Sequence, residues 1–275
     1  MGEKSDFMNN SSNRPLAAVT GASRGIGYEL AKQFAEHGFD LVIAADSDVI
    51  NQAAQDLKAL GVHVESVQVD LAQYDGVEQF YQKIKSSGRP LDAVAINAGV
   101  GVGGDFTRDT DLQDELRLID LNVKSAVHLA KRVAKDMVAR GQGRILFTSS
   151  IAATMPAPFE LVYGASKAFL QSFSQGLRNE LKDTGITVTA LMPGPTETNF
   201  FHRAGMDDTK VGTSEKDSAA EVAREGFEAL MAGKDHIVAG SWKNKAQATA
   251  AHVVPDPAVA EMHRSMSEPG SAKKK

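Results

Sequence analysis

The stretch Leu16-Ala-Ala-Val-Thr-Gly-Ala-Ser-Arg-Gly-Ile-Gly27 decides the fold of this 275-residue chain. Its apolar start has the length of a buried parallel strand, and Gly21, Gly25 and Gly27 lead into a segment with apolar residues at helical spacing. A strand, a glycine loop and a helix bring backbone N–H groups and the positive end of the helix to one point, which suits a pyrophosphate. Glycine is needed because a Cβ would block the tight turn and the approach of the phosphate. The stretch therefore predicts a nucleotide-binding βα unit.

Strand-like and helix-like segments alternate along the rest of the chain. Apolar runs typical of strands lie at residues 16–19, 40–45, 62–69, 91–96, 143–148, 185–192 and 236–239. Helical segments are expected at residues 28–38, 47–60, 74–86, 110–140, 160–183 and 217–232. This alternation predicts an α/β fold: a single Rossmann-type, doubly wound parallel sheet of about seven strands with helices on both faces. Ligands of such a sheet bind beyond the carboxyl ends of the strands.

A phenol and an ammonium stand four residues apart in Tyr163-Gly-Ala-Ser-Lys167. Residues i and i+4 share one face of a helix, so Lys167 is expected beside the phenol of Tyr163, where it favours the ionised form. A free tyrosine has a pKa near ~10, and a neighbouring cation lowers it. A tyrosine tuned in this way can exchange a proton with a carbonyl or alcohol oxygen. Such a pair is also common on solvated helix faces, so the other motifs decide its role.

The order of the motifs resembles that of the short-chain dehydrogenase/reductase family over residues 15–240. The family has a TGxxxGxG loop, an NAG strand end, a helix asparagine, a serine and a YxxxK pair in this order. The matching positions are Thr20–Gly27, Asn97–Gly99, Asn122, Ser150, and Tyr163 with Lys167. The resemblance implies an NAD(P)-dependent oxidoreductase that interconverts a ketone or aldehyde and an alcohol by hydride transfer.

The resemblance also implies roles for the catalytic residues. Tyr163 would be the acid/base, and Lys167 would lower its pKa and hydrogen-bond the nicotinamide ribose. Ser150 would hold the substrate oxygen; it lies thirteen residues before Tyr163, the usual family spacing, and Ser149 is the adjacent alternative. Asn122 would support a proton-relay water. A non-catalytic regulator that senses the redox state of the nucleotide is the rival interpretation, and lyase or epimerase chemistry stays open.

The coenzyme-binding positions follow from the same motifs. Asp70 resembles the residue that contacts the adenine amino group, and residues 193–198 resemble the family's PGxxxT, whose threonine binds the carboxamide. The full expected set is Gly21, Ser23, Arg24, Gly25, Ile26, Gly27, Asp46, Asp70, Leu71, Asn97, Ala98, Gly99, Tyr163, Lys167, Pro193, Gly194, Thr196 and Thr198.

The choice between NAD and NADP stays open in the sequence. Asp46 lies nineteen residues after Gly27, where a carboxylate accepts hydrogen bonds from the ribose hydroxyls and repels a 2′-phosphate. Arg24 in the glycine loop argues for NADP, because relatives use a basic residue there to bind that phosphate. Together these positions lean towards NAD.

Composition restricts the other function classes. The net charge of −5 gives no general affinity for nucleic acid or an anionic membrane. The chain has no cysteine and no close-spaced histidine pattern, so neither thiol catalysis nor a metal site is expected. No apolar run approaches the ~20 residues of a membrane span, and residues 1–14 do not resemble a secretory signal. A cytoplasmic enzyme with a small-molecule substrate is therefore expected.

The substrate site is expected to be lined by residues 100–106 and 151–159 and by a lid at about 195–215 that orders on ligand binding. Most of its candidate side chains are apolar, with two polar exceptions suggesting one anionic anchor; the candidates are Phe106, Met155, Phe159, Phe200, Phe201, His202, Arg203 and Met206. These aromatic residues equally suit packing of the lid against the body.

The two ends of the chain are expected to lie outside this domain. Residues 1–14 are expected to be disordered, and residues 241–275 form an extension with a short helix at about 256–266 and a disordered end from Gly270. The helix would cover its own active site or reach a neighbouring subunit. The resemblance implies a homodimer or homotetramer built on the helices near 110–140 and 160–183.

Overall fold

The computed structural model describes residues 14–250 and 254–273. The disorder expected for residues 1–13 and for the last two lysines lies outside the described residues. Arg14 is placed: its guanidinium donates to the carbonyl oxygen of Gly61.

A parallel sheet of seven strands forms the centre of the molecule, in the order β3-β2-β1-β4-β5-β6-β7. Its strands are β1 (Leu16–Thr20), β2 (Asp40–Ala45), β3 (Val64–Gln68), β4 (Ala93–Ile96), β5 (Gly143–Thr148), β6 (Ile186–Pro193) and β7 (His236–Ala239). The order reverses between β1 and β4, so the carboxyl ends of these two strands flank a crevice of the kind in which doubly wound sheets bind ligands. All seven expected strands are present, and the predicted Rossmann-type fold is confirmed.

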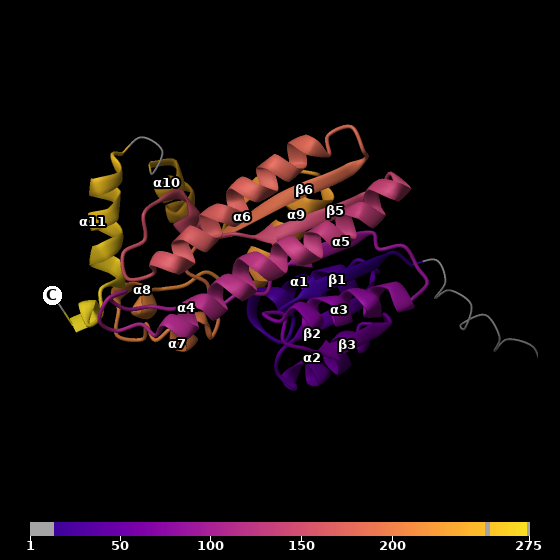
Figure 1. Cartoon of the computed structure of the whole chain (residues 1–275), viewed down its shortest axis with the longest axis horizontal. Coiled ribbons are helices and arrows are strands. Elements are labelled where there is room, and N and C mark those ends of the chain that lie inside the picture. Colours follow the sequence, from indigo (N-terminus) through magenta and orange to yellow (C-terminus); the bar gives the residue numbers. More distant parts are fainter. Residues whose placement is uncertain (1–13, 251–253, 274–275) are drawn as a thin grey trace, which may run out of the picture.

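Helices cover both faces of the sheet (Figure 1). On one face lie α1 (Gly25–Glu36), α2 (Val49–Lys58) and α9 (Ala219–Met231), and on the other α3 (Tyr74–Ser86), α5 (Ser125–Arg140) and α6 (Leu161–Glu180). Phe34 packs edge-on against Phe227 on the first face, and Phe147 packs edge-on against Phe173 on the second. Burial of each such side chain contributes about 1.5–3 kcal/mol, so the two cores hold the strand ends in fixed positions.

The single helix expected at 110–140 is divided in the structure. It consists of α4 (Leu112–Ile119), a π-helical turn at Asp120–Lys124, and α5. The wider turn holds Asn122 inward, where it is fully buried. Such π-turns are rare and occur often at functional sites.

The lid and the carboxyl-terminal extension pack against each other. The lid contains α7 (Phe200–Arg203) and α8 (Lys210–Thr213), and the extension contains α10 (Trp242–Ala250), α11 (Asp256–Ser267) and a 3-10 turn at Ser271–Lys273. In Figure 1 the extension, drawn in yellow, stands at the lid end of the molecule, beyond α7 and α8. The helix expected at 256–266 is confirmed as α11, whereas α10 was not predicted.

The expected disorder from Gly270 is wrong for residues 270–273. The backbone N–H of Gly270 donates to Oδ2 of Asp208 at 2.8 Å, and that of Ala272 donates to the Asp208 carbonyl oxygen at 3.0 Å. Ser271 accepts from the N–H of Lys210 at 2.9 Å. The sequence does not show these contacts because about sixty residues separate the partners. They fasten the end of the extension to the lid of its own chain.

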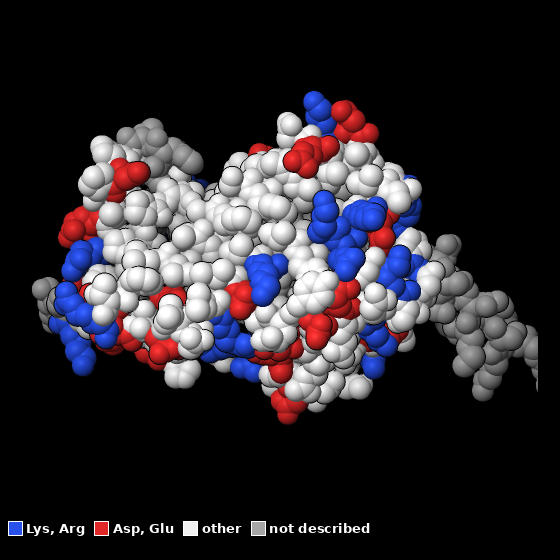
Figure 2. All heavy atoms as spheres, viewed as in Figure 1, with Lys and Arg blue, Asp and Glu red and all other residues white. Residues whose placement is uncertain are grey.

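The surface carries no large patch of one charge on the face that Figure 2 shows. Basic and acidic side chains are interspersed, and a broad area without charged side chains lies over α6. Among the described residues, no helix combines the length and apolar character needed to cross a membrane.

Candidate active site

A cavity of about 650 Å³ opens beyond the carboxyl ends of the central strands. All eighteen expected coenzyme-binding residues line it, together with Ser150. The structure thus brings the glycine loop, the NAG strand end, the YxxxK pair and the PGxxxT segment into one site. Asn122 is the exception among the expected catalytic residues, because it lies behind the cavity wall.

The glycine loop leaves room for a phosphate by excluding side chains. Gly21 and Gly25 have φ angles of +67° and +58°, which favour glycine. A Cβ on Gly27 would lie 2.2 Å from the carbonyl oxygen of Gly21 and 2.5 Å from Nδ2 of Asn97. The backbone N–H groups at the start of α1 therefore border open space, as a pyrophosphate requires. The cavity continues from this loop to Asp46 at one end and Tyr163 at the other, a layout that fits a dinucleotide.

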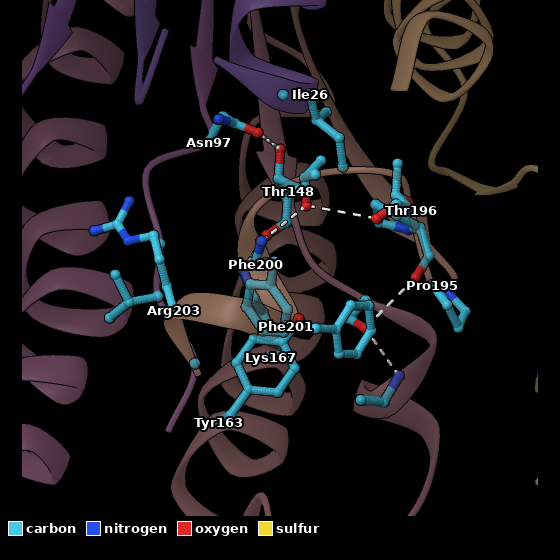
Figure 3. Close-up of a pocket in the computed structure, with 18 of the residues that line it drawn as sticks. Ile26, Asn97, Thr148, Tyr163, Lys167, Pro195, Thr196, Phe200, Phe201 and Arg203 are labelled. Carbon is cyan, nitrogen blue, oxygen red and sulfur yellow. Dashed lines mark hydrogen bonds between the residues drawn. The ribbon is translucent and has the colours of Figure 1, made fainter. Parts of the chain in front are cut away.

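Two threonines that the sequence-based site omitted fix the strand ends. Oγ1 of Thr20 accepts from the N–H groups of Asn97 at 2.9 Å and Ala98 at 3.0 Å. The hydroxyl of Thr148 donates to Oδ1 of Asn97 at 3.0 Å (Figure 3). The ends of β1, β4 and β5 are thereby held together under the cavity. The signal was present in the sequence, because each threonine ends an apolar strand and precedes a motif residue.

Lys167 lines the cavity between β5 and Tyr163. Its Nζ donates to the carbonyl oxygen of Thr148 at 2.8 Å and lies 5.7 Å from the centre of the Tyr163 ring. Burial lowers the pKa of Lys167 to about 8, because the apolar surroundings disfavour the ammonium form. At neutral pH the side chain is still mainly an ammonium ion.

The expected lowering of the Tyr163 pKa by Lys167 is not found. Burial raises the pKa of this phenol above its usual value, the negative charge of Glu160 raises it further, and a hydrogen bond with Ser150 lowers it in part. Desolvation of the phenolate outweighs the cation because Nζ of Lys167 is directed at Thr148 rather than at the phenol oxygen. The tyrosine is therefore protonated at neutral pH in this structure.

The two adjacent serines have different surroundings. Ser149 donates to the carbonyl oxygen of Lys167 at 2.9 Å and is almost fully buried. Ser150 accepts from the N–H of Ala152 at 3.1 Å at the start of a 3-10 turn, and its hydroxyl donates to the carbonyl oxygen of Pro193 at 3.5 Å. Ser150 also lowers the pKa of the Tyr163 phenol in part, and it lines the cavity. These contacts favour Ser150 over Ser149 as the serine that faces a substrate oxygen.

Asn122 is occupied by contacts within the protein. Its Oδ1 accepts from the N–H of Val100 at 2.9 Å, and its Nδ2 donates to the Val100 carbonyl oxygen at 2.9 Å and to Oγ of Ser166 at 3.1 Å. The side chain thus holds the segment after β4 against α6. Support of a relay water by Asn122 stays a prediction.

The coenzyme end of the cavity carries opposite charges. Nη2 of Arg203, on α7, lies 4.0 Å from Oδ2 of Asp46, and Arg24 lines the same cavity. Asp70 accepts from Nη1 of Arg117 at 2.9 Å and from the N–H of Ala72 at 3.0 Å. The lid therefore places a second guanidinium, that of Arg203, beside Asp46, in addition to the Arg24 that the sequence had indicated.

The substrate end differs from the expected set of residues. Met155, Phe200 and Phe201 line the cavity, and the Phe200 ring lies 5.0 Å from the Tyr163 ring (Figure 3). Outside the cavity wall, Met206 packs inside the lid and Phe106 is exposed. Of the remaining three, Arg203 lines the cavity beside Asp46, whereas Phe159 and His202 do not; His202 pairs with Asp207, on the surface.

The carboxyl-terminal extension covers the substrate end of the cavity. The sequence did not decide between this position and a contact with a neighbouring subunit. Four side chains of α11 and two of α10 line the cavity: Ala246, Gln247, Met262, His263, Met266 and Ser267. The signal available in the sequence was the stripe of Val259, Met262 and Met266 along the expected helix. That stripe could not show which surface it covers.

Comparison with known proteins gives the family. The model of the short chain dehydrogenase family matches residues 15–209. The chain belongs to this family. It is accordingly an NAD(P)-dependent oxidoreductase, with the Rossmann-type sheet found in solved members.

Relatives of this short-chain dehydrogenase cover most of its length. Oxidoreductase UcpA of Salmonella typhimurium is 32% identical over 213 residues, 76% of this chain and 81% of that protein. A short-chain dehydrogenase from Sphingobium yanoikuyae, solved with NADPH, is 33% identical, with a TM-score of 0.76 over 82% of this chain and 87% of that one. The bulky-bulky ketone specific alcohol dehydrogenase from Comamonas testosteroni is 27% identical, with a TM-score of 0.74 over 88% and 93% of the two chains.

Proposed function

We propose that the enzyme interconverts a ketone and a secondary alcohol at the end of the cavity where Ser150, Tyr163 and Lys167 converge. The observation that supports this most strongly is that Ser150 and Tyr163, each with a hydroxyl group, line a cavity whose other end is the glycine loop. A carbonyl oxygen placed between these two hydroxyls would accept from both. The ketone specificity in the name of the Comamonas relative agrees with this choice.

The chain's own residues account for the proton transfer. When bound, NAD(P) donates or accepts the hydride. Tyr163 would give its phenolic proton to the oxygen of a ketone being reduced, or take the proton of an alcohol being oxidised. Its raised pKa keeps the phenol protonated, which is the form that reduction needs. Lys167, buried and mainly cationic, would offset the negative charge left on the phenol oxygen.

For the coenzyme we propose NADP, which revises the preference drawn from Asp46. Arg203 lies beside Asp46 and Arg24 lines the same cavity, so two guanidinium groups could bind a 2′-phosphate. Arg203 also offsets the negative charge that would repel that phosphate. The NADPH bound to the Sphingobium relative supports this choice.

Replacement of the phenol tests the proposal. Tyr163→Phe should lower kcat for a ketone by roughly 10²–10⁴-fold and leave the Kd for NADPH unchanged, because only the proton donor is lost. Tyr81→Phe is the matched control, since that phenol is hydrogen-bonded to Asp136 away from the cavity.

Full turnover by Tyr163→Phe would refute the assigned role. The rival regulator predicts tight coenzyme binding by the unaltered protein without turnover of any ketone or alcohol. Product identification by mass spectrometry excludes lyase and epimerase chemistry on the same site.

A further inference from the structure

Glu160 is a buried carboxylate at the substrate end of the cavity. It directly precedes α6, three residues before Tyr163, and is 6% exposed. Its side chain makes no capping hydrogen bond to the start of α6. It turns instead to the carboxyl-terminal extension, where Oε2 accepts from Oγ of Ser267 at 3.0 Å and lies 3.2 Å from Nε2 of His263. All four side chains line the cavity.

The second oxygen of this carboxylate has no partner within the protein. Within residues 14–250 and 254–273, Oε1 of Glu160 takes part in no hydrogen bond or ion pair. An ionised carboxylate accepts up to about four hydrogen bonds, and Oε1 of Glu160 is not among the buried side-chain atoms that lack a partner, so it is open to the cavity. Because Glu160 lines the cavity, a ligand there can supply the missing donor.

We propose that Glu160 is a specificity-determining residue that accepts a hydrogen bond from a second polar group of the substrate. The substrate would then be a ketone or alcohol that also carries a hydroxyl or ammonium group a few bonds from the reacting carbon. This inference rests on the function proposed above. It adds the substrate class, which the family motifs leave open.

The charge of the same carboxylate acts against anionic substrates. A substrate carboxylate near Oε1 would meet a like charge in surroundings that screen poorly. Two basic side chains of the lid lie at other acidic groups: Arg203 lies at Asp46, and His202 at Asp207. Arg264 of α11 donates to Glu268 and lies over the Phe159 ring. The anionic anchor expected from His202 and Arg203 is therefore replaced by a site of opposite preference.

The extension holds this recognition site in place. Ser267 and His263 are one turn apart on α11, with Oγ of Ser267 3.2 Å from Nε2 of His263. Both contact Oε2 of Glu160, so they hold this oxygen and leave Oε1 to accept from a ligand in the cavity. Met262 and Met266 of the same helix supply the apolar wall beside it. His263 and Ser267 are positioning residues here, since they act through Glu160.

The test compares Glu160→Gln with the unaltered enzyme on three matched ketone series. These are 2-alkanones, their ω-hydroxy derivatives and their ω-carboxylates, over a range of chain lengths, assayed with NADPH. The amide keeps the shape but loses the charge, so kcat/KM for the hydroxy series should fall about tenfold, equivalent to ~1.4 kcal/mol, mainly through KM. For the carboxylate series kcat/KM should rise, and for the plain series it should stay within about threefold. The control is Glu261→Gln, because Glu261 is an exposed residue of α11.

The outcomes separate this inference from the proposed function. Opposite shifts for the hydroxy and carboxylate series support the inference, because a merely distorted site would lower all three. Equal shifts, or none, overturn it while the ketone activity stands. If the unaltered enzyme reduces no ketone of any series, the proposed function itself fails. Should Glu160→Gln be unstable, Ser267→Ala provides the second variant, with the preference for the hydroxy series again expected to fall.

Discussion

Arg203 offers the sharpest test of how this enzyme selects its coenzyme. Its guanidinium lies 4.0 Å from the carboxylate of Asp46, and the two side chains are 52% and 48% exposed. A 2′-phosphate bound beside them would carry about −1.5 to −2 charge. Arg203→Gln should therefore weaken NADPH binding and leave NADH binding equal or slightly tighter, since Asp46 is then free to accept from the ribose hydroxyls.

The expected loss of NADPH binding energy follows from how far Arg203 is exposed to solvent. A hydrogen bond between charged partners contributes about 1.5–3 kcal/mol when shielded, and an exposed ion pair about 0.2–1 kcal/mol. Since Arg203 is half exposed, we expect Arg203→Gln to weaken NADPH binding by about 1–2 kcal/mol. This corresponds to roughly a 5- to 30-fold increase in the Kd for NADPH. The difference in the Kd for NADPH between the variant and the unaltered enzyme should become smaller at high salt, because salt screens exposed charges.

The assay is a nucleotide fluorescence titration of the purified enzyme with NADPH and with NADH, at low and high salt. Arg108→Gln is the matched control, because that arginine is exposed, pairs with Asp105 and lies outside the cavity. Asp46→Asn should act in the opposite direction, strengthening NADPH binding and weakening NADH binding. Equal weakening of both coenzymes by Arg203→Gln would show that the residue only supports the lid. An unchanged Kd for both would refute the assignment.

Two further predictions concern the buried lysine and the glycine loop. Lys167 has a pKa of about 8 in the folded enzyme, against an ordinary value of 10.5. Between these two pH values the unfolded chain binds more protons than the folded protein. The free energy of unfolding of the unaltered protein therefore increases as the pH rises through this range. The stability of Lys167→Met relative to the unaltered protein should therefore fall from pH 7 to pH 10 in urea unfolding; a constant difference would contradict the lowered pKa. Gly27→Ala should abolish coenzyme binding, and in urea unfolding it should destabilise the fold by more than ~1 kcal/mol, because the new Cβ would meet the Gly21 carbonyl oxygen. Gly176→Ala is the control and should do neither, because the space around Gly176 is open. Normal NADPH binding by Gly27→Ala would refute the packing argument.

The sequence by itself determined the fold and the framework of the site. Short apolar runs, glycine-rich ends and helical periodicity are local signals, and the carboxyl ends of parallel strands meet at one edge of a sheet wherever the strands lie along the chain. That is why Gly21, Asn97 and Ser150, far apart in the sequence, could be expected at one edge of the sheet, where the structure brings them into one cavity. The place of Tyr163 in this site was implied by the family resemblance, since Tyr163 lies on a helix.

Only the tertiary structure decided the charges that surround the site. The pairing of Arg203 with Asp46 and of Ser267 with Glu160 joins residues 157 and 107 positions apart, and no local pattern specifies such contacts. The pKa of Tyr163 likewise depends on how deeply the phenol is buried and on where Nζ of Lys167 points, neither of which their spacing fixes. The motifs therefore identify the reaction, whereas the packing of the lid and the extension sets what the enzyme binds.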